Sequence, residues 1–331
     1  MRDAYLEVPE GSLEAAGTVM LDWNISARIA NIHRRQERFE PLNLGAVEVL
    51  RLRNLVKRIP EGAEILSAFG AAEPETRRLP SVTDVERYNT RTDVTATYLS
   101  AQPDYLLHLL GGGQSGGLVI ESQPDEAPYE ADPFRAWFMV SYAALLSAAV
   151  IDRKTGLSRA ERADEFRFWL EHELRVSASR EAWVGFLLLA GTGDQPGKAR
   201  RLLKLDGRTD IRDAIWGAAW DLMYTRIPGI MAQPKFRRLW KLPIVFVTDD
   251  SALPEALAGM STEFLVENAH GVHFAGDRFN VDLLHPDARP LVQSYVRRES
   301  KRVFTQSRGM RGPVIKRAAY LARVLEGRLG Q

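Results

Sequence analysis

Two short apolar runs, far apart in the chain and each followed by acidic residues, constrain the fold most. Residues 18–24 (TVMLDWN) and 242–248 (LPIVFVT) are predicted to be buried strands, the first ending at Asp22 and the second before Asp249 and Asp250. Uninterrupted apolar runs are typical of strands that are covered on both faces. Because long stretches with helical periodicity separate them, we expect an α/β fold with a parallel sheet between helices.

Helical periodicity and punctuation by glycine and proline predict the remaining elements. Residues 63–69 (AEILSAF) form a further candidate strand, and residues 261–288 show no clear pattern. The predicted helices cover 25–38, 44–57, part of 80–110, 134–151, 157–174, 181–189, 211–227, 251–260, 291–306 and 314–329. Ser158 and Glu161 have the spacing of a capping box, and Pro228 is expected to end the helix over 211–227.

Composition excludes several classes of protein. The 331 residues contain no cysteine, which excludes a disulfide scaffold, a cysteine zinc site and thiol catalysis. The first residues are charged where a signal peptide would be apolar. The apolar run over 134–151 is too short and too mixed for a membrane span. We therefore expect a cytoplasmic protein that does not contact a membrane.

Charge is distributed unevenly along the chain. The formal net charge is +1, but residues 289–331 carry eleven Lys or Arg against two Glu, a net +9, which leaves −8 for the rest. A basic segment on a mildly acidic body indicates an anionic partner, with nucleic acid the leading case. A solvated, arginine-rich helix face is the alternative interpretation. The candidate nucleic-acid contacts are Arg297, Arg298, Lys301, Arg302, Arg308, Arg311, Lys316 and Arg317.

The acidic residues after the predicted strands indicate a common edge. In a parallel sheet the carboxyl ends of the strands share one edge, where ligands bind. Asp22 and Asp249 would meet there, and Glu73 or Glu75 follows the strand over 63–69. The helix over 211–227 adds Asp221, which has apolar neighbours and therefore needs a partner if it is buried.

Several carboxylates at one edge repel one another unless they bind cations or share protons. Oxygen ligands alone suit Mg²⁺ or Mn²⁺, and such metals hydrolyse phosphodiester bonds by activating a bound water. The competing interpretation of Asp22 and Asp249 is that each caps the helix that follows its strand.

Two of these segments carry a resemblance to a known family. Residues 21–25 (LDWNI) resemble the opening strand of PIN-domain nucleases, an apolar residue followed by Asp-x-Asn and a further apolar residue. Residues 246–250 (FVTDD) resemble the last acidic strand end of that family. An acid after the second strand and an Asp on the helix before the last strand complete its order of four acids.

The resemblance implies a divalent-metal-dependent endoribonuclease whose catalytic metal ligands are Asp22, Glu73, Asp221 and Asp249. Three other acids could take these positions instead. Glu75 would replace Glu73, Asp213 would replace Asp221, and Asp250 would replace Asp249. Asn24 and Thr248 would support the site by orienting it or by hydrogen bonding. We expect RNA as substrate in preference to single-stranded DNA, and Asp22→Asn to abolish cleavage with the fold nearly intact.

The chain is longer than a typical PIN domain, which implies additions to the core. We expect a PIN-like core of short parallel sheet flanked by helices over 1–79 and 209–260, a mostly helical insertion over 80–208 and a basic helical region over 261–331. Members of this family are often toxins or defence nucleases, held in check by an inhibitory protein and often homo-oligomeric.

Two other classes compete with the nuclease. The same core without catalytic activity would be an adaptor that binds nucleic acid or protein. A nucleotide- or cofactor-binding α/β protein is disfavoured because no glycine-rich loop follows the first strand.

Overall fold

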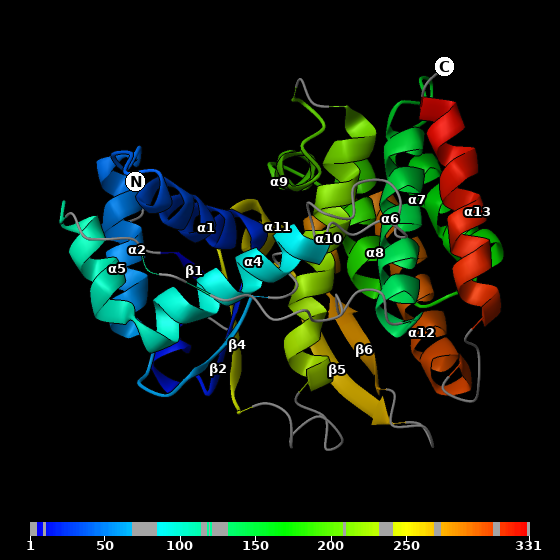
Figure 1. Cartoon of the computed structure of the whole chain (residues 1–331). Helices are drawn as coiled ribbons and strands as arrows, with labels where there is room; N and C mark the ends of the chain where they lie inside the picture. The colour runs from blue at the N-terminus through cyan, green and yellow to red at the C-terminus, as the bar shows by residue number, and fades with distance from the viewer. Residues whose placement is uncertain are drawn as a thin grey trace. The chain divides into compact units, whose positions relative to one another are not determined.

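The chain forms two compact units, the first from residues 1–131 and 224–251 and the second from 132–223 and 252–331. The structure is a computed structural model (Figure 1) that describes residues 5–8, 11–67, 85–113, 118, 120, 132–207, 210–231, 241–267, 273–306 and 312–329. It is a mixed α/β protein, as the sequence predicts. Residues 85–113, assigned to the insertion by sequence, belong to the first unit.

A four-stranded sheet organises the first unit. Its strands are ordered β1-β4-β2-β3, where β1 is Leu6–Val8, β2 is Thr18–Leu21, β3 is Glu64–Leu66 and β4 is Ile244–Thr248. The central strand β2 pairs in parallel with β3 and with β4, and all residues of β2 and β4 are buried. The predicted parallel pairing is therefore confirmed. The antiparallel edge strand β1 was not predicted.

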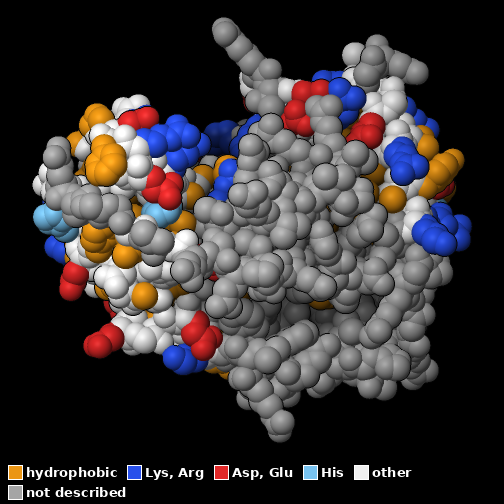
Figure 2. Space-filling view, in the orientation of Figure 1, with side chains coloured by type: hydrophobic (Ala, Val, Ile, Leu, Met, Phe, Trp, Pro, Cys, Tyr) orange, Lys and Arg blue, Asp and Glu red, His pale blue; other side chains and the backbone are white. Residues whose placement is uncertain are grey.

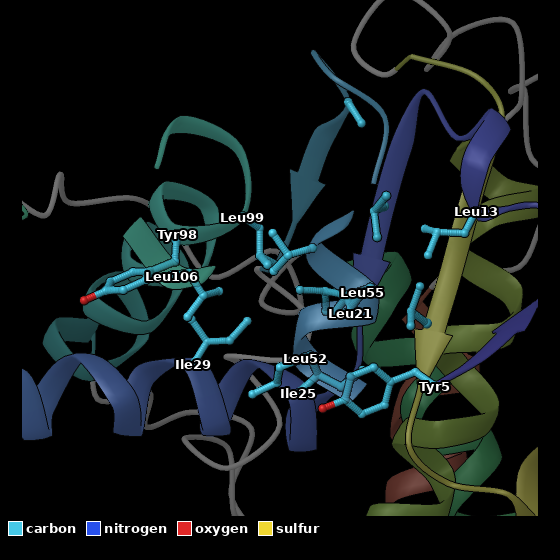
Figure 3. Close-up of a cluster of buried hydrophobic side chains, with 14 of the residues drawn as sticks. Tyr5, Leu13, Leu21, Ile25, Ile29, Leu52, Leu55, Tyr98, Leu99 and Leu106 are labelled. Atoms are coloured by element: carbon cyan, nitrogen blue, oxygen red, sulfur yellow. The ribbon is translucent and has the colours of Figure 1, made fainter. Parts of the chain in front are cut away.

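Helices cover this sheet and close the core of the first unit. They are α1 (Trp23–Glu37), α2 (Ala46–Arg58), α4 (Val85–Ala96), a π-helical segment (Thr97–Ala101) and α5 (Pro103–Leu110). Leu21 of β2, Ile25 and Ile29 of α1, and Leu52 and Leu55 of α2 converge in one buried cluster (Figure 3). The apolar positions on α1 recur every three or four residues, which places them on the face toward the sheet.

The second unit is mostly helical. Its helices are α6 (Asp132–Asp152), α7 (Arg159–Phe168) with a π-helical segment (Trp169–Leu174), α8 (Ser179–Ala190), α9 (Gln195–Leu202), the first part of α10 (Ile211–Met231), α11 (Ala252–Leu257), α12 (Arg289–Gln306) and α13 (Gly312–Leu329). Helix α8 is buried over nearly its whole length, as expected for a helix that is apolar all round. Helix α6 packs against both α8 and α13.

Several local predictions can be checked directly. The capping box is present, because Ser158 Oγ accepts from the Glu161 amide at 3.2 Å and Glu161 Oε2 accepts from the Ser158 amide at 2.7 Å. The prediction that Pro228 ends its helix is wrong, since α10 continues to Met231. Proline removes one backbone donor, and so close to the end of the helix that loss is tolerated.

A β-hairpin lies where the sequence showed no clear pattern. Strand β5 (Met260–Glu267) pairs antiparallel with β6 (His273–Phe279) in the second unit, with an irregularity between Thr262 and Phe264. Helix α9 was also not predicted. Among the described residues, no helix combines the length and the apolar character that a membrane crossing requires.

Candidate functional site at the carboxyl edge of the sheet

Asp22 joins the central strand to the first helix. It directly follows β2 and is the N-cap of α1, where its Oδ1 accepts a hydrogen bond from the Ile25 amide at 2.9 Å. The residue is 1 % exposed, so this carboxylate is held inside the unit. The interpretation of Asp22 as a helix cap is therefore confirmed, because the side chain satisfies one of the free amides of the first turn.

The same carboxylate also holds the neighbouring strand. Asp22 Oδ2 accepts from Thr248 Oγ1 at 2.6 Å and from the Asp249 amide at 2.9 Å. The register of β2 against β4, with Leu21 opposite Val247, brings these groups together. The predicted hydrogen bond from Thr248 is therefore present. Burial raises the pKa of Asp22, while the three hydrogen bonds favour its charged form.

Two arginines neutralise Asp249. Its Oδ2 accepts from Arg28 Nη2 at 2.6 Å and its Oδ1 accepts from Arg51 Nη1 at 2.5 Å. Arg28 comes from α1 and Arg51 from α2, and Arg28 also pairs with Glu48 at 3.2 Å. Sequence reasoning missed both arginines. The signal that could have found Arg28 is its place beside Ile25 and Ile29 on the buried side of α1.

A buried phenol completes this edge. The hydroxyl of Tyr5 is buried beside the guanidinium group of Arg28, whose Nη1 is also buried. Burial raises the pKa of Tyr5 to about 12, and nearby Arg28 opposes this shift. The edge thus combines two carboxylates, two guanidinium groups and a neutral phenol.

The other predicted acids are placed differently. Glu73 and Glu75 lie outside the described residues. Asp213 is exposed and Asp221 is buried, and both lie on the part of α10 that belongs to the second unit. Among the described residues of the first unit, the edge therefore holds two of the four predicted ligands, Asp22 and Asp249.

The supporting residues lie at the same edge. Asn24 is exposed in the first turn of α1. The Asp250 amide donates to Thr248 Oγ1 at 3.0 Å, so Thr248 connects the end of β4 to Asp22. These contacts show how the strand end is ordered around a single hydroxyl group.

The edge supplies carboxylate oxygens from two residues, Asp22 and Asp249. Carboxylate oxygens are the ligands that Mg²⁺ and Mn²⁺ prefer, and a carboxylate offers about four lone pairs, of which Asp22 uses three in its hydrogen bonds. Asp249 accepts one bond on each oxygen and so keeps capacity on both. No group of three or more His, Asp or Glu residues suited to a metal ion is found among the described residues.

The predicted basic contacts lie on the last two helices of the second unit. Arg297, Lys301 and Lys316 are exposed, and Arg298 Nε pairs with Glu171 at 2.8 Å. Arg317 donates to the backbone oxygens of His172, at 3.2 Å, and Glu173. The side chain of Arg302, and the whole of Arg308 and Arg311, lie outside the described residues.

An open depression of about 650 Å³ lies at the opposite edge of the sheet. Its lining residues include Ala16 and Gly17, which precede β2, Gly62, which precedes β3, and Lys241, which precedes β4. A side chain at position 17 would collide with the Leu242 carbonyl, since its Cβ would lie 2.6 Å from that oxygen. This depression is therefore distinct from the candidate site.

Comparison with known proteins identifies no relative of this chain. The sequence matches no protein-family model, and neither a curated protein nor a solved structure matches it. Any function must therefore be argued from the chemistry of the residues.

Proposed function

We propose that this protein is a divalent-metal-dependent nuclease that hydrolyses RNA. The observation that carries the proposal is the meeting of Asp22 and Asp249 at adjacent parallel strand ends, with the Thr248 hydroxyl bonded to Asp22 at 2.6 Å. Acids at this edge of an α/β sheet are well placed to act on a ligand. Their order and neighbours agree with the resemblance to PIN-domain nucleases.

Asp22 and Asp249, the two predicted ligands that lie together in the first unit, would hold Mg²⁺ or Mn²⁺. When bound, the metal would supply an activated water and neutralise charge on the scissile phosphate. Thr248 would fix the orientation of the Asp22 carboxylate, since a positioned hydroxyl limits the rotation of its acceptor. The Asp249 amide gives a second fixed point on the same oxygen.

Arg28 and Arg51 have a role in this proposal as phosphate-binding residues. Guanidinium groups bind carboxylate and phosphate by the same geometry, so the arginines that hold Asp249 could equally hold a phosphodiester. A cation on Asp249 would release the arginines toward the substrate.

The test is cleavage of labelled single-stranded RNA and DNA with Mn²⁺, Mg²⁺ or EDTA. We expect cleavage of RNA that requires metal and falls by at least about 100-fold in Asp249→Asn, because a metal ligand contributes several kcal/mol to the transition state. Cleavage by Asp249→Asn at the wild-type rate, or cleavage that persists in EDTA, would contradict the proposal.

Asp250→Asn is the matched control, because it removes the next carboxylate in the chain and leaves Asp249 paired with Arg28 and Arg51. We expect this variant to keep most of the activity. If Asp250→Asn is inactive and Asp249→Asn is active, the proposed role of Asp249 is contradicted, and the acid required at this strand end is Asp250. Thermal unfolding of both variants shows whether a loss of activity is caused by a loss of fold.

A second candidate function is an adaptor without catalytic activity. The observation that favours it is the engagement of both acids, since Asp22 accepts three hydrogen bonds and Asp249 is paired with two arginines. These contacts would then be structural, and Mn²⁺ would not raise the melting temperature. A metal-dependent rise that is lost in Asp249→Asn favours the nuclease, because a ligand that binds the native state stabilises it.

A further inference from the structure

Helix α13 presents a basic face that contains one exposed aromatic ring. Its buried side, Ala318, Leu321, Ala322 and Leu325, is at most 8 % exposed, and the helix packs against α6. Lys316, Tyr320 and Arg323 are exposed and spaced by four and three residues, which puts them on the opposite side. We call these three residues the α13 strip.

The α13 strip is available for binding. Tyr320 is 65 % exposed, which is unusual for so large a ring. Within the described part of the chain, the side chains of Lys316, Tyr320 and Arg323 make no hydrogen bond or ion pair. The acid of this helix, Glu326, accepts a hydrogen bond from Tyr142 at 2.7 Å and so is held on another side.

Side chains next to the α13 strip are also apolar or basic. Val324, 36 % exposed, lies beside Tyr320, and Arg328 is exposed one turn further on. Figure 2 shows lysine and arginine side chains next to hydrophobic ones along the right-hand edge, where α13 lies in Figure 1. Positive charge around an aromatic ring is the pattern that single-stranded nucleic acid binds.

We propose that the α13 strip binds single-stranded RNA, with Tyr320 stacked on a base and with Lys316 and Arg323 on the flanking phosphates. This inference rests on the proposed function for its substrate class. It goes further by assigning a base-stacking residue and adding Arg323 to the contacts. A ring can stack only on a base whose face is open, so a paired duplex is a poor ligand for this surface.

The apolar content of the strip argues against a lipid surface. An amphipathic helix binds a membrane through its apolar face, but the apolar face of α13 is buried in the second unit. Tyr320 and Val324 alone offer little area for insertion. Charge and ring together therefore favour a polyanion with exposed bases.

The test is the binding of a fluorescently labelled oligouridylate to the full-length protein in EDTA, followed by anisotropy. We expect Tyr320→Ala to weaken binding by about 5- to 150-fold, the range for loss of one stacked base, without changing the salt dependence. Tyr320→Phe should bind as the wild type does, because the ring is retained. Phe39→Ala is the matched control, since Phe39 is an 84 % exposed ring in the first unit.

The charges are tested separately. We expect the double variant Lys316→Gln, Arg323→Gln to lower the slope of log affinity against log salt by about 1.4, because each phosphate contact on a single strand contributes about 0.7. The double variant Arg38→Gln, Arg53→Gln removes two exposed charges from the first unit and should leave the slope unchanged.

The outcomes separate this inference from the proposed function. If RNA binding in EDTA depends on Tyr320 but RNA is not cleaved in Mn²⁺, the RNA-binding role of the α13 strip is supported and the nuclease proposal is contradicted. If the wild type cleaves RNA with metal and Tyr320→Ala binds RNA as tightly as the wild type, the RNA-binding role of the α13 strip is overturned and the nuclease proposal is supported. A lower molar mass of Tyr320→Ala in light scattering would also overturn it, since the strip would then contact a second copy.

Discussion

Each unit of the protein buries carboxylates, but in different surroundings. In the first unit Asp22 lies where a parallel strand meets a helix, and two of its three donors are backbone amides. In the second unit Glu181 is completely buried within α8, and Ser141 Oγ of α6 donates to it at 2.5 Å. Burial alone is therefore a poor indicator of a functional acid, because both units bury acids that the surrounding fold satisfies.

The start of α8 strengthens this comparison. Ser179 Oγ bonds the carboxylate of Asp277, and Glu299 accepts from the Ala178 amide at 3.3 Å. Both acids thus lie at the N-terminus of a helix, where negative charge is favourable. Asp22 has the same relation to α1. Asp249 is held by two arginines, but so is Glu171 of the second unit, which pairs with Arg167 and Arg298. What distinguishes the candidate site is that Asp249 lies beside Asp22 at the end of an adjacent parallel strand.

The largest effect should come from removing Asp22. We expect Asp22→Ala to lower the free energy of unfolding by about 3 kcal/mol, because it deletes a helix cap and leaves the buried Thr248 hydroxyl and Asp249 amide without an acceptor. Urea denaturation measures the loss, and hydrogen exchange should place it in β2 and β4. A loss confined to the second unit would contradict this role.

Asp22→Asn should also be destabilising, by about 1–2 kcal/mol. If the new amide nitrogen takes the place of Oδ2, it faces the Asp249 N–H, and two donors then meet. The expectation from the sequence that this substitution leaves the fold nearly intact therefore disagrees with the geometry. Cleavage assays of this variant therefore need its thermal unfolding measured alongside.

A smaller effect is expected from the buried acid of the second unit. Ser141→Ala removes a donor to Glu181 and should cost about 1–2 kcal/mol, since a buried acceptor loses a hydrogen bond. Hydrogen exchange should increase in α6 and α8 and remain unchanged in β2. Ser147→Ala, at an equally buried position of α6, is the control. Equal effects of the two variants would show that the contact with Glu181 is not important.

The smallest effect concerns pH and the first unit. Burial lowers the pKa of His33, whose Nδ1 lies 3.2 Å from the Tyr98 hydroxyl. Below about pH 6.5 the unfolded chain then binds more protons than the native state, so stability falls as the pH is lowered. Thermal unfolding at about pH 7.5 and pH 5.5 should show a larger drop for the wild type than for His33→Asn. Equal drops in melting temperature for the two proteins would contradict this role of His33.

The sequence predicts those parts of the fold that depend on local patterns. The strands β2 and β4, helix α1 and the capping box of α7 all follow from apolar runs and cap residues within a few positions. Strand β1 has three residues, and its partner in β4 lies about 240 positions away, so no local pattern reveals it. The hairpin of β5 and β6 was missed because polar residues interrupt its alternation.

The candidate site could be predicted in part. An Asp that ends a strand can be a helix cap or a ligand, and both interpretations of Asp22 fit the sequence equally well. The structure adds the donors on its second oxygen, which come from β4, and the two arginines on Asp249. Such contacts depend on how α1, α2 and β4 pack, which no spacing within one segment encodes.

The position of β4 has a consequence for the order in which the chain folds. During synthesis β2 and β3 emerge early, but the strand that completes the sheet follows most of the second unit. Until residue 248 has left the ribosome, one edge of β2 lacks its partner and Asp22 lacks two of its donors. Contacts of such long sequence separation form slowly, and an unpaired strand edge invites association with other chains. We therefore expect the nascent first unit to depend on chaperones until β4 is in place.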